Sequence, residues 1–264
     1  MALVVPGGTP ARPAAITARE LAYRAAAAAA AQPAVPPGQW VYWKETIVWR
    51  FLGKPPRQAH MKPSGTTYQV WTTADSEKAA FIVDGSIRYL CPSQLIPAPC
   101  QTIGQPLPTA LTEGGAQADI NTIPVSYADL SSLPGNPVTL DRYFASLRGP
   151  GESAAVSEFQ IIEDLVISYV MPPALTAELY RALGDVPGVT VNDHAVDAAG
   201  RTGIGFQISI PTPVNPHPVD QLILDPSTYE WMGYTSSLSA FGSLKGLETA
   251  VLKSSLVSGP GVVP

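Results

Sequence analysis

Apolar and polar positions alternate along the first half of the chain, which predicts strands with one buried face. In the segment from Gln39 to Phe51, the alternating apolar residues are Val41, Trp43, Ile47, Trp49 and Phe51. Glu45 interrupts this face, where it either lines a cavity or sits at a strand bend. Three further strands are predicted over residues 66–73, 79–83 and 86–90. Asp84-Gly85 joins the last two as a hairpin turn, so the first half is predicted to be an antiparallel meander.

In four segments the apolar residues recur with the spacing of a helix. Thr17 and Glu20 form a capping box, so a helix is predicted to start at Thr17 and to end before Pro33. Its alanine-rich faces carry few large residues, and it is expected to pack weakly, as a stalk or a first docking helix. The other three helices are predicted over residues 137–148, 154–169 and 172–184.

A second meander follows these helices. Strands are predicted over residues 189–196, 203–210, 222–224 and 230–235, and a last strand over residues 247–256. The long Pro/Gly/Thr-rich passage 101–136 shows few strong elements, and it is predicted to be a wrapped surface loop or a lid. Helices that feed antiparallel strands indicate an α+β protein.

Composition indicates the class of protein but does not indicate any particular reaction or ligand. Charged residues make up only 14% of the 264 residues, and the formal net charge is −5. The basic residues are scattered, so no patch for nucleic acid is predicted. Low charge with 10 Tyr and 5 Trp suits an extracytoplasmic, β-rich protein. No apolar run approaches the ~18 residues of a membrane span.

The apolar start, Met1 to Gly8, lacks the charged region of a signal peptide. It is interpreted as the outer end of a membrane helix whose beginning is missing, or else as a frayed apolar terminus. The first interpretation predicts that the reading frame extends upstream of Met1 into a full apolar span.

The two cysteines, Cys91 and Cys100, flank a proline-rich loop. One disulfide is expected here, and two free buried thiols are the alternative. A metal site is not predicted, because no second cysteine pair occurs and the histidines lie far off in sequence. The spacing is also not that of a Cys-x-x-Cys redox motif.

No catalytic motif is found. Nucleophile elbows, zinc-protease helices and phosphate-binding loops are all missing from the sequence. His60, His194 and His217 each stand in turn-rich or edge sequence. Glu163 and Asp164 are adjacent on a helix and therefore point about 100° apart, which favours a solvated face. No catalytic residue, metal or cofactor is predicted.

A set of motifs resembles a known family. The set comprises an alanine-rich helix, the strand Gln39-Trp-Val-Tyr-Trp-Lys-Glu45, Val186-Pro-Gly-Val189, Asp197-Ala-Ala-Gly-Arg201 and Leu224-Asp-Pro226. This resembles an uncharacterised actinobacterial membrane-anchored family, often encoded beside extracytoplasmic-function sigma factors. The resemblance covers roughly residues 17 to 256 and implies a cytoplasmic tail, one membrane helix and an extracytoplasmic domain. The tail and most of that helix are absent from this chain.

The order of elements is also similar to that of periplasmic lipoprotein carriers and sigma-regulatory lipoproteins. That resemblance implies an α+β half-barrel, in which a strongly curved antiparallel sheet wraps about three helices. The expected organisation is a membrane-proximal stalk and linker over 1–38, one extracytoplasmic domain over 39–258 and a tail over 259–264.

Three functions follow as hypotheses. The first is a noncatalytic, membrane-tethered domain on the extracytoplasmic face, which binds a lipid or acyl chain, or an envelope protein partner, and is linked to envelope-stress signalling. The second is a structural, wall-associated domain. The third is a hydrolase, which a cluster of Glu45, Asp75, Asp84 and a histidine would favour. For the first, an apolar groove is predicted between sheet and helices, and its predicted lining is Trp43, Ile47, Trp49, Tyr68, Val70, Phe81, Phe159, Ile162 and Tyr169.

Overall fold

A computed structural model describes most of the chain. The described residues are 16–36, 38–51, 66–74, 78–83, 86–92, 101–102, 127–133, 135–149, 151–210, 218–236 and 244–264. The helices are α1 (Ala18–Ala30), α3 (Tyr127–Ser132), α4 (Pro137–Leu147), α5 (Ala154–Ser168) and α6 (Pro173–Asp185). The strands are β1 (Trp40–Phe51), β2 (Thr66–Thr73), β3 (Lys78–Val83), β4 (Ser86–Pro92), β5 (Gln101–Thr102), β6 (Thr190–Val196), β7 (Thr202–Ser209), β8 (Val219–Leu224), β9 (Trp231–Ser236) and β10 (Leu244–Val257).

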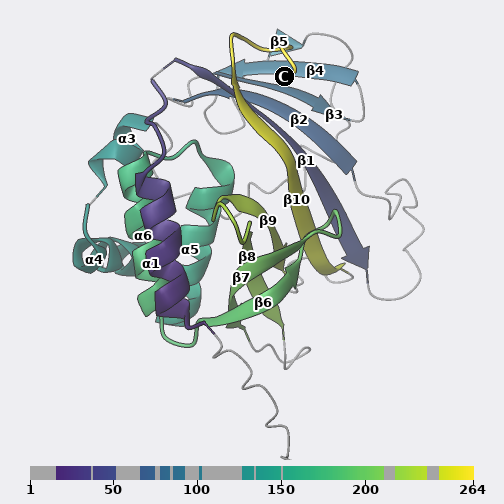
Figure 1. Cartoon of the computed structure of the whole chain (residues 1–264). Coiled ribbons are helices and arrows are strands. Elements are labelled where there is room, and N and C mark those ends of the chain that lie inside the picture. Colours follow the sequence, from purple (N-terminus) through teal and green to yellow (C-terminus); the bar gives the residue numbers. More distant parts are fainter. Residues whose placement is uncertain are drawn as a thin grey trace, which may run out of the picture.

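All strands belong to one antiparallel sheet. Its order is β5-β4-β3-β2-β1-β10-β9-β8-β7-β6, so β1 and β10 join two sequence-local meanders at the centre. This central ladder runs from the pair Trp40↔Val257 to the pair Phe51↔Leu244. Figure 1 shows the helices gathered on one side, next to β6–β9, while β2–β5 extend away from them.

The main core lies between the helices and the second meander. Its helical members include Leu21, Phe144 and Leu179, and its fully buried strand members include Phe206 and Leu222. Among the described side chains, the strand residues of this cluster come from β6–β9 and the loops beside them. The helices therefore cover one part of the sheet.

A small second cluster forms where β1, β2 and β10 meet. Tyr42 pairs with Trp71 across β1 and β2, and their ring centroids lie 5.1 Å apart. Trp71 is 1% exposed, and its Nε1 donates to the carbonyl of Val262 at 2.8 Å. The chain after β10 thus returns to this sheet and satisfies the buried indole.

Helix α1 packs tightly, so the expectation of weak packing is wrong. Leu21, Ala22, Ala25 and Ala26 are all buried. A Cβ added to Gly184 on α6 would lie 2.4 Å from the Cβ of Ala22. Small residues on both helices therefore let the two backbones approach closely, and the alanine-rich face is a close-packing surface. The predicted N-cap is confirmed, since Thr17 Oγ1 accepts from the amide of Glu20 at 3.2 Å.

The predicted α+β class with an antiparallel sheet is confirmed. The stronger prediction of a half-barrel that wraps about three helices is wrong, because the sheet is not strongly curled and the structure describes five helices. The physical reason is that the helices pack side by side on one another and on β6–β9, and the first meander continues past them. Helix α3 and strand β5 were not predicted from the passage 101–136.

Candidate ligand-binding groove

A groove of about 430 Å³ lies where the ends of α1 and α5 approach the sheet. This volume falls within the range of roughly 300–1,000 Å³ that is usual for small-molecule sites. Its lining comprises Ala29, Gln32, Pro33, Val35, Val41, Trp43, Val166, Ile167, Tyr169, Val170, Met171, Pro173, Thr176, Glu230, Trp231, Val251, Ser254, Ser255 and Leu256. A smaller hollow of about 190 Å³ shares many of these residues and reaches Tyr180 and Tyr229. The two hollows form one mostly apolar depression, which is called the groove below.

The helical wall follows from the sequence of the link between α5 and α6. Helix α5 gives way to extended backbone at Tyr169, with φ −130° and ψ 150°. Pro172 and Pro173 follow, and prolines hinder continuation of a helix at the residues before them. Tyr169, Val170 and Met171 therefore form a short extended link along the groove instead of another helical turn.

The sheet wall comes from both meanders. Trp43 of β1 pairs with Ser254 of β10, and both residues line the groove. Val41 and Leu256 form the next groove-lining pair in the same ladder. Trp231, at the start of β9, supplies the wall from the second meander. The groove thus spans the place where the two meanders meet.

Polar residues are a minority of the lining, and they are Gln32, Thr176, Glu230, Ser254 and Ser255. Gln32 Nε2 donates to Glu230 Oε1 at 3.3 Å, which links the end of α1 to the start of β9. The Nε1 atom of Trp231 is buried and has no acceptor among the described residues. A buried indole N–H without an acceptor costs free energy.

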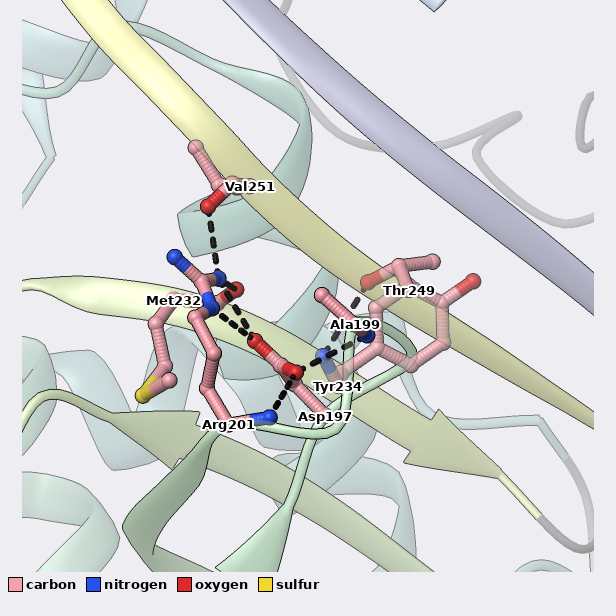
Figure 2. A network of polar contacts seen from close by, with 7 residues as sticks. All are labelled: Asp197, Ala199, Arg201, Met232, Tyr234, Thr249 and Val251. Carbon is pink, nitrogen blue, oxygen red and sulfur yellow. Dashed lines mark hydrogen bonds and ion pairs between the residues drawn. The ribbon is translucent and has the colours of Figure 1, made fainter. Parts of the chain in front are cut away.

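The wall strands β9 and β10 are held together in an unusual way. Their regular ladder comprises only Leu247↔Ser236 and Glu248↔Thr235. Figure 2 shows further bonds that hold these strands together. The amide of Tyr234 on β9 donates to Thr249 Oγ1 on β10 at 3.1 Å, and the turn between β6 and β7 supplies others. Arg201 Nη2 donates to the carbonyl of Met232 on β9 at 3.1 Å and to that of Val251 on β10 at 2.6 Å.

Asp197 holds this arginine in place. Its side chain is fully buried, and its carboxylate accepts from the amides of Ala199 and Arg201, each at 2.9 Å. It also accepts from Arg201 Nε at 2.7 Å. Charge-assisted bonds of this kind are stronger than neutral ones. The turn therefore fixes the spacing of β9 and β10 next to Trp231 and Val251, two residues of the groove wall.

A buried polar cluster lies under α5, one helical turn before the groove-lining Val166. Asp220 of β8 is 1% exposed and accepts from Gln160 Nε2 at 3.1 Å and from Ser236 Oγ at 2.6 Å. Glu163 of α5 is 6% exposed, and its Oε1 has no partner among the described residues. The expectation that Glu163 lies on a solvated helix face is therefore wrong, because this face of α5 packs on the sheet.

Burial shifts the titration of these groups. It raises the pKa of Glu163 well above its usual value, and the negative charges of Asp220 and Asp164 add to the effect. It also raises the pKa of Asp220, against hydrogen bonds from Ser236 and Gln160 that lower it. Burial raises the pKa of Glu45 to about 7.

The pKa of Tyr234 on β9 also responds to these acids. Burial raises its pKa, and the negative charges of Glu163, Glu45, Asp164 and Asp220 contribute to the same shift. The four carboxyls therefore act on one phenol from three elements, α5, β1 and β8. This arrangement disfavours ionisation of any one member while its neighbours are charged.

The sheet residues of the predicted groove share one face. The register places Trp43 opposite Val70 and Val70 opposite Phe81, and it places Tyr68 opposite Glu45, two positions along β1 from Trp43. Trp43 lines the groove, whereas Ile47, Tyr68 and Val70 do not. The side chains of Trp49 and Phe81 lie outside the described residues.

The predicted helix residues separate into two groups. Tyr169 lines the groove. Phe159 and Ile162 are both 0% exposed and belong to the main core, so they pack the helices on the sheet and do not face a ligand. The groove residues that sequence reasoning missed include Val166, Met171, Trp231 and Val251. The available signal was Pro172-Pro173, which the sequence reasoning used only as the start of α6, although prolines also disfavour helix in the residues before them.

The described residues contain no group of three or more acidic, histidine or cysteine side chains placed to hold a metal ion. His194 is exposed on β6, beside Asp193 at 3.7 Å. Asp75, Asp84, His60 and His217 lie outside the described residues, as does the proposed disulfide, since Cys100 and the side chain of Cys91 are not described.

None of the described helices has the length and apolar character needed to cross a membrane. No family model matches the chain, and no curated protein matches it. Among solved structures, the chain is distantly similar to one described as the complex structure of Pseudomonas aeruginosa MucA/MucB. The identity is 13% and the TM-score 0.29, over 94% of this chain and 58% of that one. The chain therefore spans little more than half of that protein's length.

Proposed function

We propose that this chain is a noncatalytic binding domain that holds a hydrophobic ligand of the lipid or acyl-chain class in the groove. The proposal places it on the extracytoplasmic face of the cell membrane, tethered by a helix upstream of this chain and linked to envelope-stress signalling. These placements rest on the family resemblance of the sequence motifs.

One observation carries the binding proposal. The groove has a mostly apolar lining from the end of α1, the α5–α6 link and three strands. Each buried CH₂ of an acyl chain contributes about 0.8 kcal/mol, so a chain laid along such a lining binds without a dedicated charged partner.

A groove-filling variant tests the proposal. Ser254 is exposed on β10 and lines the groove, so Ser254→Trp places a large ring in the binding space. Leu252, 39% exposed on the same strand and outside the lining, provides the matched control Leu252→Trp. The expected result is saturable binding of a fluorescent acyl probe by the wild type and Leu252→Trp, and at least about tenfold weaker binding by Ser254→Trp.

An apolar segment of an envelope protein is the other occupant to test. An acyl probe that binds saturably and is displaced by free lipid supports the lipid class. If no acyl probe binds at any concentration, while an apolar peptide does bind and Ser254→Trp abolishes it, the lipid proposal is wrong and the peptide takes its place.

A further inference from the structure

We propose that Glu163, Asp220 and Tyr234 form a proton-dependent latch between α5 and the sheet, and that its deprotonation loosens the α5 wall of the groove. The latch itself is independent of the ligand. Its effect on ligand affinity rests on the function proposed above.

The latch lies on the side of α5 that packs against the sheet. Gln160 and Glu163 lie one turn apart on the side of the helix that meets the sheet, and Gln160 bonds to Asp220. Glu163 and Asp220 are both more than nine-tenths buried, and Glu163 Oε1 lacks a partner among the described residues. Val166 follows Glu163 by three residues, so it shares the same side of the helix and lines the groove.

The charges around Glu163 decide the direction of the switch. The negative charges of Asp220 on β8 and of Asp164 on α5 act on Glu163, and those of Glu163, Asp164, Asp220 and Glu45 act on Tyr234. In the sheet, Asp220 pairs with Ser236, two residues along β9 from Tyr234. All of these titratable neighbours gain negative charge when they lose a proton. In a buried site of low dielectric, such charges repel strongly and are screened much less by salt than exposed charges.

At low pH the carboxyls are protonated and neutral, so they do not repel one another and α5 stays packed on the sheet. As the pH rises, each lost proton leaves an unsolvated negative charge beside another acid. The protein relieves this cost by moving α5 away from β8 and β9 so that water reaches the carboxylates. Burial and neighbouring acids raise the pKa of Glu163, which sets the transition above the ordinary range of a glutamate.

Hydrogen exchange of the whole chain tests the latch without any ligand. The readout is protection of the amides of residues 162–168 between pH 5 and pH 9, corrected for the intrinsic pH dependence of exchange. The wild type is expected to lose protection by at least about tenfold over this range, the factor that corresponds to one pKa unit. Constant protection in the wild type overturns the proposal, whatever any variant does.

Two matched variants test whether Glu163 causes the pH-dependent loss of protection. Glu163→Gln is expected to flatten the pH dependence of residues 162–168. Glu158→Gln changes another acid of α5, whose pKa is raised to about 7 by burial and by Asp141 and Asp185, away from the sheet. It is expected to keep the wild-type pH dependence at residues 162–168. The latch is contradicted if Glu158→Gln removes the pH dependence of protection at residues 162–168 while Glu163→Gln keeps it.

The acyl probe then tests the coupling. Its dissociation constant is expected to rise by about tenfold from pH 5 to pH 9 in the wild type and to stay constant in Glu163→Gln. Binding that is independent of pH in a wild type whose α5 loses protection overturns the coupling. If no probe binds, the proposed function fails, and the exchange data still decide whether the latch exists.

Discussion

Arg201 donates from Nε to the buried carboxylate of Asp197 at 2.7 Å, and its Nη2 bonds to carbonyls on two separate strands. The pair adds to the short ladder and to the bond from the Tyr234 amide to Thr249 Oγ1, which join β9 and β10 directly. These carbonyls belong to Met232 and Val251, so one ion pair in a hairpin turn positions two strands of the groove wall.

Arg201→Ala is expected to destabilise the protein by about 2–3 kcal/mol. The full cost of breaking a buried pair is ~3–5 kcal/mol, and it is reduced here because the Arg201 side chain is 41% exposed. Urea unfolding at pH 7 measures the change. Arg19→Ala is the control, because it breaks an exposed pair with Asp185 that is worth at most about 1 kcal/mol. Equal losses in the two variants would contradict the role given to Arg201.

Gly184→Ala is expected to lower stability, although alanine is the better helix former by about 1 kcal/mol. The new Cβ would lie 2.4 Å from Ala22 Cβ and 3.2 Å from the Cα of Arg19, so α1 must shift. Overpacking of this kind costs about 1–3 kcal/mol. Gly135→Ala is the control, since nothing lies within 4 Å of its added Cβ. Thermal unfolding that leaves both variants unchanged would show that α1 does not pack closely on α6.

Glu45→Gln is expected to stabilise the protein at alkaline pH and to have little effect at pH 4. Burial raises the pKa of Glu45 from 4.5 to about 7, so the unfolded chain loses this proton at lower pH than the folded protein. The wild type therefore loses stability as pH rises from about 4.5 to 7, and the variant removes this loss. The difference at pH 8 should be about 1–3 kcal/mol in urea unfolding. A stabilisation that is the same at pH 4 and pH 8 would exclude this cause.

Cys91 and Cys100 are expected to form a disulfide in protein exported under oxidising conditions. A loop this short gains about 2–3 kcal/mol in the chain-entropy model. Mass spectrometry under non-reducing conditions should find the two cysteine peptides linked. Two alkylated free thiols in the exported protein would refute the pairing.

Much of the local structure could be predicted because short-range chemistry determines it. Thr17 with Glu20 marks the start of α1, and Asn136 caps α4 by accepting from the amide of Thr139 at 3.0 Å. The alternation on β1 correctly separates Trp43 on the groove side from Tyr42 in the opposite cluster. Such signals depend on neighbours a few residues apart.

The features that could not be predicted from the sequence depend on contacts between distant segments. The burial of Glu163 follows from the packing of α5 on β8 and β9, which no residue near Glu163 in sequence indicates. The close approach of α1 and α6 needs Ala22 and Gly184 at matching positions, 162 residues apart in sequence. The Asp197 motif was recognisable in sequence, but its role as a link between β9 and β10 required the register of both strands.

The central claim is that the groove holds an apolar ligand, and native mass spectrometry tests it most directly. Full-chain protein purified from an actinobacterial host would be sprayed under non-denaturing conditions, beside Ser254→Trp and Leu252→Trp. The account predicts a bound lipid-sized mass on the wild type and Leu252→Trp that is lost from Ser254→Trp. The account is contradicted if the wild type carries no added mass and a saturating acyl probe adds none.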